Sequence, residues 1–127
     1  MNLEEQSASA VGAHGLWKGR LRAAVESGVT DVPVEVARDD RQCGFGRWLH
    51  GARVDEKARR SSHYATCMEL HRRFHQAAAE VLSLAVAGKK QEAAKALAPD
   101  REFTRASIDL TRAMLAWQGS QYSQARK

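Results

Sequence analysis

Two histidines one helical turn apart are the residues of this chain best suited to binding a metal ion. His71 and His75 are four positions apart, so on a helix both side chains project from the same face. Their ring nitrogens can then converge on a single ion. Such a pair also arises by chance, half exposed and without a ligand, so the argument for a metal site depends on further residues elsewhere in the chain.

His14 is the first of these further residues, because it lies inside the apolar stripe of an expected N-terminal helix. At steps of three and four residues, that stripe consists of Val11, His14, Trp17, Leu21 and Val25. An unpaired imidazole among apolar side chains is costly, and a lone core histidine usually has a hydrogen-bond partner. Combined with an inward-facing pair from another helix, His14 favours a metal site between the helices of a bundle.

Cys43 is the candidate for a fourth ligand. It stands at the start of an expected short helix whose sequence reads Cys43-Gly44-Phe45-Gly46-Arg47-Trp48. The two glycines permit close backbone approach, and the two aromatic rings can anchor the segment on the bundle. A metal ion and the helix N-terminus would both stabilise the thiolate. Three His and one Cys form a tetrahedral zinc set, whose soft and borderline donors disfavour Mg²⁺ and Ca²⁺.

Cys67 is the competing thiol, because Cys67, His71 and His75 share one helix face. At 1.5 Å per residue these three span about 12 Å. On a straight helix, that is too long for the first and third to meet at one ion. We therefore interpret Cys67 as a small buried apolar residue. His50 and His63 fall near helix ends among polar residues, and we expect both at the surface.

The elements that must position these residues are helical almost throughout. The apolar periodicity predicts helices over about 11–28, 41–50, 62–87, 89–98 and 100–118. Gly28 and Gly88 should end two of them in the left-handed conformation, and Asp39 or Asp40 can cap the short helix over 41–50.

Two segments interrupt this pattern. Residues 29–37 alternate apolar and polar side chains, but a single strand would have no partner and Pro33 removes a donor, so we expect an extended loop. Residues 52–60 are charged and predict a turn or a poor helix. The fold class that follows is all-α, a four-helix bundle with an additional short helix that carries Cys43.

Composition limits the function classes. The chain has 127 residues with 43% hydrophobic content, which suits one domain over 1–127, with a core of about 8–118 and a polar tail over 119–127. No apolar run is long enough to span a bilayer. The net charge is +5, but the basic residues are dispersed as on solvated helix faces, so we expect no nucleic-acid partner. Two cysteines favour a reducing, cytoplasmic setting.

The motifs together resemble the chemoreceptor zinc-binding (CZB) domain family. The family pattern is a His-x-aromatic-or-Leu element, then Cys-x-apolar-Gly-x-aromatic, then His-x3-His. This chain has His14-Gly15-Leu16, the Cys43–Trp48 segment and His71-Arg72-Arg73-Phe74-His75. Twenty-six residues separate Leu16 from Cys43 and 22 separate Trp48 from His71, both as in the family. The resemblance covers roughly residues 8–118.

The resemblance implies a site, a cofactor and partners. The zinc ligands would be His14, Cys43, His71 and His75, in a helical bundle that forms a homodimer. Members of the family regulate bacterial chemoreceptors and diguanylate cyclases from the cytoplasm. Some respond to zinc and others to oxidants such as hypochlorous acid, through the ligand cysteine. These residues include no signalling helix, cyclase domain or membrane anchor, so we expect either a free-standing member or an excised domain, and the output stays open.

Three functions compete at this stage. The first is a zinc- or oxidant-responsive sensory domain, and the second is a structural zinc site in a non-catalytic helical adaptor. The third is an enzyme that uses zinc-bound water, which needs an open coordination position and usually a carboxylate base. Four protein ligands close the site, and neither Glu69 nor Glu80, the acidic residues nearest the histidine pair in sequence, is part of a recognisable motif. We therefore expect no catalysis.

Overall fold

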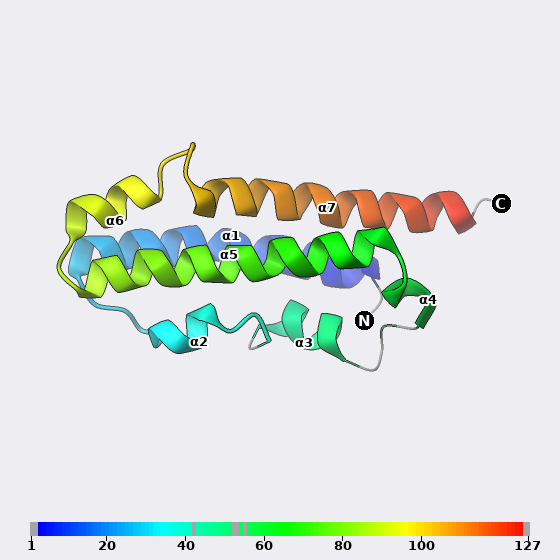
Figure 1. Ribbon diagram of the computed structural model, residues 1–127, viewed down its shortest axis with the longest axis horizontal. Coiled ribbons are helices and arrows are strands. Elements are labelled where there is room, and N and C mark those ends of the chain that lie inside the picture. The colour runs from blue at the N-terminus through cyan, green and yellow to red at the C-terminus, as the bar shows by residue number, and fades with distance from the viewer. Residues whose placement is uncertain (1–2, 42, 52–53, 55, 126–127) are drawn as a thin grey trace.

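Three long helices of similar length form the body of the protein. The computed structural model describes residues 3–41, 43–51, 54 and 56–125. In Figure 1, α1 (Leu3–Ser27), α5 (Ser62–Val86) and α7 (Glu102–Ala125) run side by side, and each of them contacts the other two. The described part of the chain contains no strand. The prediction of an all-α bundle is confirmed.

Four short helices complete the bundle: α2 (Val34–Arg38), α3 (Gly44–His50), α4 (Glu56–Arg59) and α6 (Lys90–Ala96). Figure 1 shows α2 and α3 following one another along one side of α1 and α5. The expected helix over 89–98 is α6, which has two turns, and the last helix continues beyond residue 118 to Ala125. Within the predicted turn at 52–60, α4 is a single turn, and residues 52, 53 and 55 lie outside the described part.

The extended loop predicted over 29–37 is wrong for its second half, where α2 forms. The carbonyl of Pro33 accepts hydrogen bonds of 3.0 Å from the backbone N–H groups of Val36 and Ala37. Proline lacks an N–H but keeps its carbonyl, and its fixed φ suits the start of a helix. Pro33, which argued against a strand, is therefore the N-cap of a short helix, and Ala37 of that helix is buried.

The glycine ends of two helices were predicted correctly, whereas the N-cap of α3 was not. Gly28 and Gly88 have φ values of +74° and +80° and end α1 and α5 in the left-handed region, as expected. The cap of α3 was predicted wrongly. Its N-cap is Cys43, whose Sγ accepts from the Gly46 N–H at 3.3 Å. Asp39 instead accepts from the Arg41 N–H at 3.0 Å, in a turn that precedes the helix.

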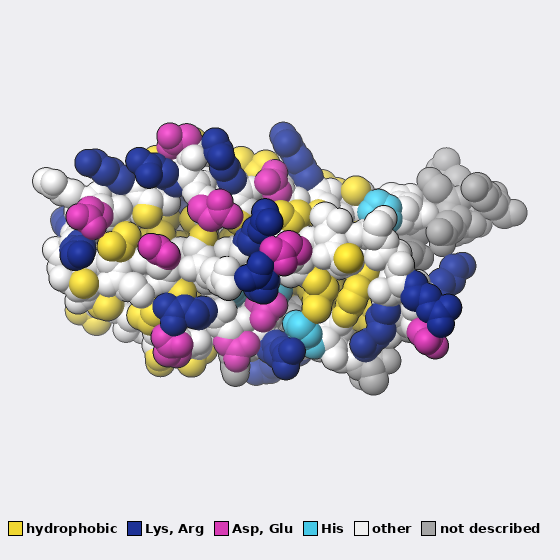
Figure 2. Space-filling view, in the orientation of Figure 1, with side chains coloured by type: hydrophobic (Ala, Val, Ile, Leu, Met, Phe, Trp, Pro, Cys, Tyr) yellow, Lys and Arg dark blue, Asp and Glu magenta, His cyan; other side chains and the backbone are white. Residues whose placement is uncertain are grey.

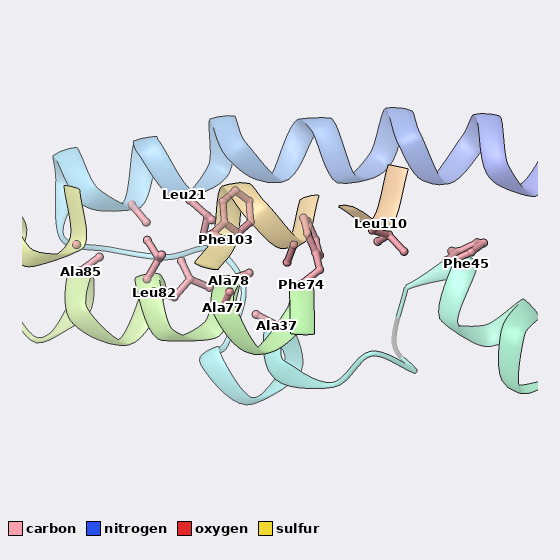
Figure 3. Packing of buried hydrophobic residues seen from close by; sticks show 14 of the residues in the cluster. Leu21, Ala37, Phe45, Phe74, Ala77, Ala78, Leu82, Ala85, Phe103 and Leu110 are labelled. Carbon is pink, nitrogen blue, oxygen red and sulfur yellow. The ribbon is translucent and has the colours of Figure 1, made fainter. Parts of the chain in front are cut away.

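Apolar side chains of the three long helices form the core. In Figure 3, Leu21 of α1, Leu82 of α5 and Phe103 of α7 lie between the helices. Alanines on α5, namely Ala77, Ala78 and Ala85, keep the backbones close. Of the stripe predicted for the N-terminal helix, His14, Leu21 and Val25 are buried and Trp17 is half-buried, whereas the side chain of Val11 lies outside the described part. Each fully buried leucine or phenylalanine contributes about 1.5–3 kcal/mol, so this core gives the candidate site a rigid frame.

Figure 2 shows Lys, Arg, Asp and Glu side chains interspersed over the visible face, without a large area of one sign. Among the described residues, no helix is both long enough and apolar enough to cross a membrane.

Candidate metal centre

The structure brings together the four residues that the sequence singled out. His14 comes from α1, Cys43 from the N-cap of α3, and His71 and His75 from α5, and one candidate ligand atom from each lies within 4.8 Å of all the others. The three imidazoles are buried, with His71 fully inaccessible, whereas Cys43 is half-buried. The cluster is therefore closed by protein on the side of the long helices and is most accessible at the thiol.

The distances within the cluster fit a tetrahedral zinc ion. His71 Nε2 is 3.1 Å from His75 Nε2 and 3.2 Å from Cys43 Sγ, and Cys43 Sγ is 4.0 Å from His14 Nε2. With Zn–N of about 2.0–2.1 Å and Zn–S of about 2.3 Å, neighbouring ligand atoms of a tetrahedral site lie about 3.4–3.6 Å apart. The fold thus places a His3Cys donor set at nearly the spacing that zinc requires.

The hydrogen bond on the far side of His75 sets the direction of its lone pair. His75 Nδ1 is 2.9 Å from the carbonyl oxygen of Ala37. Because a carbonyl oxygen only accepts, Nδ1 carries the proton and Nε2 presents its lone pair to the cluster. The unexpected helix α2 is therefore part of the site, since it positions this carbonyl.

Burial keeps the three imidazoles neutral. It lowers the pKa of His14 to about 4, with a smaller contribution from His75. Burial and the neighbouring histidines lower the pKa of His71 to about 2. Burial also lowers the pKa of His75, although the Ala37 carbonyl and Asp40 oppose this shift. Neutral imidazoles are the form that binds metal ions.

The thiol of Cys43 needs a positive charge nearby in order to ionise. Burial raises its pKa, and the N–H groups of Gly46 and Phe45 offset only part of that effect. A bound zinc ion supplies such a charge, and it would be held by the same four residues. The donor chemistry and the geometry therefore both fit a zinc ion.

Gly46 explains how α3 approaches the cluster so closely. A Cβ atom at this position would lie 1.7 Å from the carbonyl oxygen of Asp40 and 3.1 Å from Cε1 of His71. A Cβ atom on Gly44 would meet nothing within 4 Å. The expectation of close backbone approach is thus confirmed at Gly46 and wrong at Gly44, which faces open space.

Aromatic contacts hold α3 on the long helices, as predicted for Phe45 and Trp48. The buried ring of Phe45 meets His71 edge-on, with centroids 5.2 Å apart. The ring of Trp48 stacks on Phe45 and lies 5.7 Å from that of Trp117 on α7. Tyr64 of α5 donates a 2.7 Å hydrogen bond to the Leu49 carbonyl. The helix that carries the thiol is therefore tied to both α5 and α7.

The predictions for the remaining cysteine and histidines can be compared with their burial. Cys67 is fully buried outside the cluster, and burial raises its pKa to about 12, as an apolar role requires. His63 is only half-buried. His50 is likewise half-buried, so the expectation of surface positions holds only in part for both histidines. Nε2 of His50 lies 3.5 Å from Asp40 Oδ2, because α3 folds back beside the loop that carries Asp40.

Asp40 is the residue beside the site that sequence reasoning missed as part of it. The acidic residues considered from sequence were Glu69, which pairs with Arg72 and Arg73, and Glu80, which is exposed. Asp40 lies three residues before Cys43, and its Oδ2 is 4.0 Å from His71 Nδ1. Asp40 could have been found from the sequence by its proximity to Cys43 and not by proximity to the histidines.

Comparison with known families agrees with this geometry. The sequence model of the chemoreceptor zinc-binding domain matches residues 14–82, which is more than half of the chain and spans all four clustered residues. No curated protein and no solved structure matches the chain significantly. On the family match and the His-Cys-His-His cluster, the chain belongs to the chemoreceptor zinc-binding domain family.

Proposed function

We propose that this chain is a zinc-binding sensory domain that regulates bacterial signalling, of the chemotaxis or cyclic-di-GMP type, in the cytoplasm. The observation that carries the proposal is the His3Cys cluster, in which three buried histidines come from long helices and the thiol comes from the N-cap of the short helix α3. A domain of this design needs no catalytic group. Its output is a change in the position of α3, which a signalling partner would detect.

The charges of the four residues suit a stable zinc complex. Three neutral imidazoles and one thiolate leave a formal charge of +1 when zinc is bound. Zinc supplies the positive charge that keeps Cys43 ionised at neutral pH. His71 and His75 are held by α5 and His14 by α1, whereas Cys43 depends on α3. Three ligands therefore belong to long helices of the core, and we propose that the fourth moves with α3 when its bond to zinc is lost.

Cys43 is the ligand on which an oxidant would act. It is half-buried, and thiolates are oxidised far more readily than imidazoles. With hypochlorous acid, the sulfur attacks the oxidant to give a sulfenic acid and chloride (Cys–S⁻ + HOCl → Cys–SOH + Cl⁻), so sulfur loses two electrons and chlorine gains them. The anionic donor is lost, and α3 would detach while the three histidines stay in place.

A structural zinc site in a non-catalytic helical adaptor is the alternative. It is favoured by the complete burial of His71 and by the aromatic contacts that tie α3 to α5 and α7. In that case α3 would stay docked, and Cys43 would be inert to mild oxidants. Four protein ligands in either case leave no open position for a zinc-bound water, which argues against an enzyme.

The proposal includes a second copy of this chain and a signalling partner. A homodimer, together with a chemoreceptor or a diguanylate cyclase as the regulated protein, is what the resemblance to the family supports. We propose no nucleic-acid partner, because the basic residues are dispersed along the sequence and not gathered in one stretch.

Oxidation of the zinc-loaded protein distinguishes the sensor from the adaptor. One equivalent of hypochlorous acid is expected to release zinc in proportion to the loss of the Cys43 thiol. A chromogenic zinc indicator measures the release, and mass spectrometry locates the added oxygen. Cys67→Ala serves as the control and should respond like the wild type, because Cys67 is fully buried. Retention of zinc with Cys43 unmodified would support the structural site instead.

A further inference from the structure

Asp40 lies at the edge of the cluster, on the loop between α2 and α3. Its Oδ2 atom is 4.0 Å from Nδ1 of His71 and 3.5 Å from Nε2 of His50, and its side chain is 19% exposed. Its backbone is held in place as well, since its carbonyl lies against Gly46 so closely that no Cβ would fit there. The position of this carboxylate is therefore built into the packing of α3.

His71 has a buried nitrogen that needs an acceptor. Its Nε2 faces Cys43 and His75, so in the neutral ring that binds a metal the proton is on Nδ1. That Nδ1 atom is buried and has no hydrogen-bond partner among the described residues. The Asp40 carboxylate lies about 1 Å beyond hydrogen-bond distance, a gap that a small rotation or one bridging water closes.

The charge of Asp40 also matches what the site requires. A zinc complex of three imidazoles and one thiolate is positive by one unit, in a place where burial has already lowered the pKa of His14, His71 and His75. The carboxylate of Asp40 supplies one negative charge beside it. Among the described residues, the charged groups near this face include Asp39 on the same loop and Arg72 of α5, whose guanidinium is exposed and bonded to Glu69.

We propose that Asp40 is a positioning residue of the zinc site: its carboxylate accepts a hydrogen bond from His71 Nδ1 and balances the positive charge of the bound complex. The proposal rests on the zinc-binding function proposed above. Metal-binding histidines commonly donate their second N–H to a carboxylate or carbonyl, and such partners orient the ring and raise its donor strength. Ala37 has this role for His75, and Asp40 has it for His71.

Zinc affinity in three variants, at two neighbouring positions, tests the proposal. Asp40→Asn is expected to weaken zinc binding about 10- to 100-fold, and Asp40→Ala to weaken it at least as much, because it removes the acceptor as well as the charge. Asp39→Asn is the matched control. It removes the same charge from the same loop but keeps an acceptor for the Arg41 N–H. Its affinity should stay within about threefold of the wild type. Competition with a chelator of known affinity measures all four dissociation constants.

Two further readouts separate a positioning role from a merely structural one. In metal-free protein, Asp40→Asn should unfold at nearly the wild-type temperature, and with Co²⁺ bound its visible absorption bands should shift, because the donor strength of His71 changes. Unchanged affinity in both Asp40 variants, or equal weakening in Asp39→Asn, would overturn the proposal and leave the zinc site standing. Absence of zinc binding in the wild type would overturn the proposed function along with it.

Discussion

Replacing Gly46 with alanine is expected to weaken zinc binding about 10- to 100-fold and to lower the stability of the zinc-bound fold. The new Cβ would lie 1.7 Å from the Asp40 carbonyl oxygen and 3.1 Å from Cε1 of His71. The first of these is a backbone atom, which cannot rotate away as a side chain could. Either α3 or the loop before it must therefore move, and α3 carries Cys43 at its N-cap. Overpacking of this kind costs about 1–3 kcal/mol, and each 1.36 kcal/mol is a factor of ten in affinity.

Gly44→Ala is the matched control for this experiment. It adds the same methyl group to the same short helix, two residues earlier, where nothing lies within 4 Å of the new atom. Zinc affinity should remain at the wild-type value. Chelator competition and thermal unfolding of the zinc-loaded proteins measure both effects. Equal losses in the two variants would contradict the close docking of α3 on the Asp40 loop.

Zinc is expected to stabilise the fold strongly, and the increment should depend on Cys43. At a free zinc concentration about 1,000 times the dissociation constant, the free energy of unfolding rises by about 4 kcal/mol, because the unfolded chain holds the ligands less well. Cys43→Ala should lose most of this increment. Cys67→Ala should start from a lower stability, since its side chain is fully buried in the core, yet gain as much from zinc as the wild type does. Chemical denaturation with and without zinc measures the increments. A full increment in Cys43→Ala would contradict the assignment of Cys43.

Lowering the pH should decrease the free energy of unfolding of the metal-free protein. Burial lowers the pKa of His14 from 6.5 to about 4, so the unfolded state binds a proton that the folded state does not. The free energy of unfolding therefore falls as the pH decreases from about 6.5 to about 4, and the lower pKa of His71 extends the loss to more acid solution. Protons also compete with zinc for the same nitrogens. Metal-free protein that is equally stable at pH 7.5 and pH 5.0 would contradict the burial of neutral histidines.

Periodicity alone was sufficient to find the long helices and the residues they bring together. The stripes that place His14 on one helix and His71 and His75 on another follow from steps of three and four residues, which any buried helix face must show. The distance argument against Cys67 also held, because a nearly straight helix cannot bring residues two turns apart to one point. These inferences depend only on regular geometry.

The loop before α3 could not be predicted in the same way. The cap by Cys43, the turn at Asp39 and the approach of Asp40 to His50 and His71 depend on how a short irregular segment folds back over a helix. The path of such a loop has no periodic pattern of side chains from which it could be predicted. Helix α2 was missed for a related reason: a single turn is too short for a 3.6-residue period to be distinguished from the alternation of an extended chain.

X-ray absorption at the zinc edge, on protein whose zinc content has been measured by elemental analysis, tests the central claim most directly. We expect one zinc per chain, coordinated by three nitrogens at about 2.0–2.1 Å and one sulfur at about 2.3 Å. In Cys43→Ser the sulfur shell should disappear, whereas in Cys67→Ala it should remain. Purified wild-type protein that binds no zinc, or whose bound zinc has no sulfur neighbour, would contradict the claim that His14, Cys43, His71 and His75 form a zinc site.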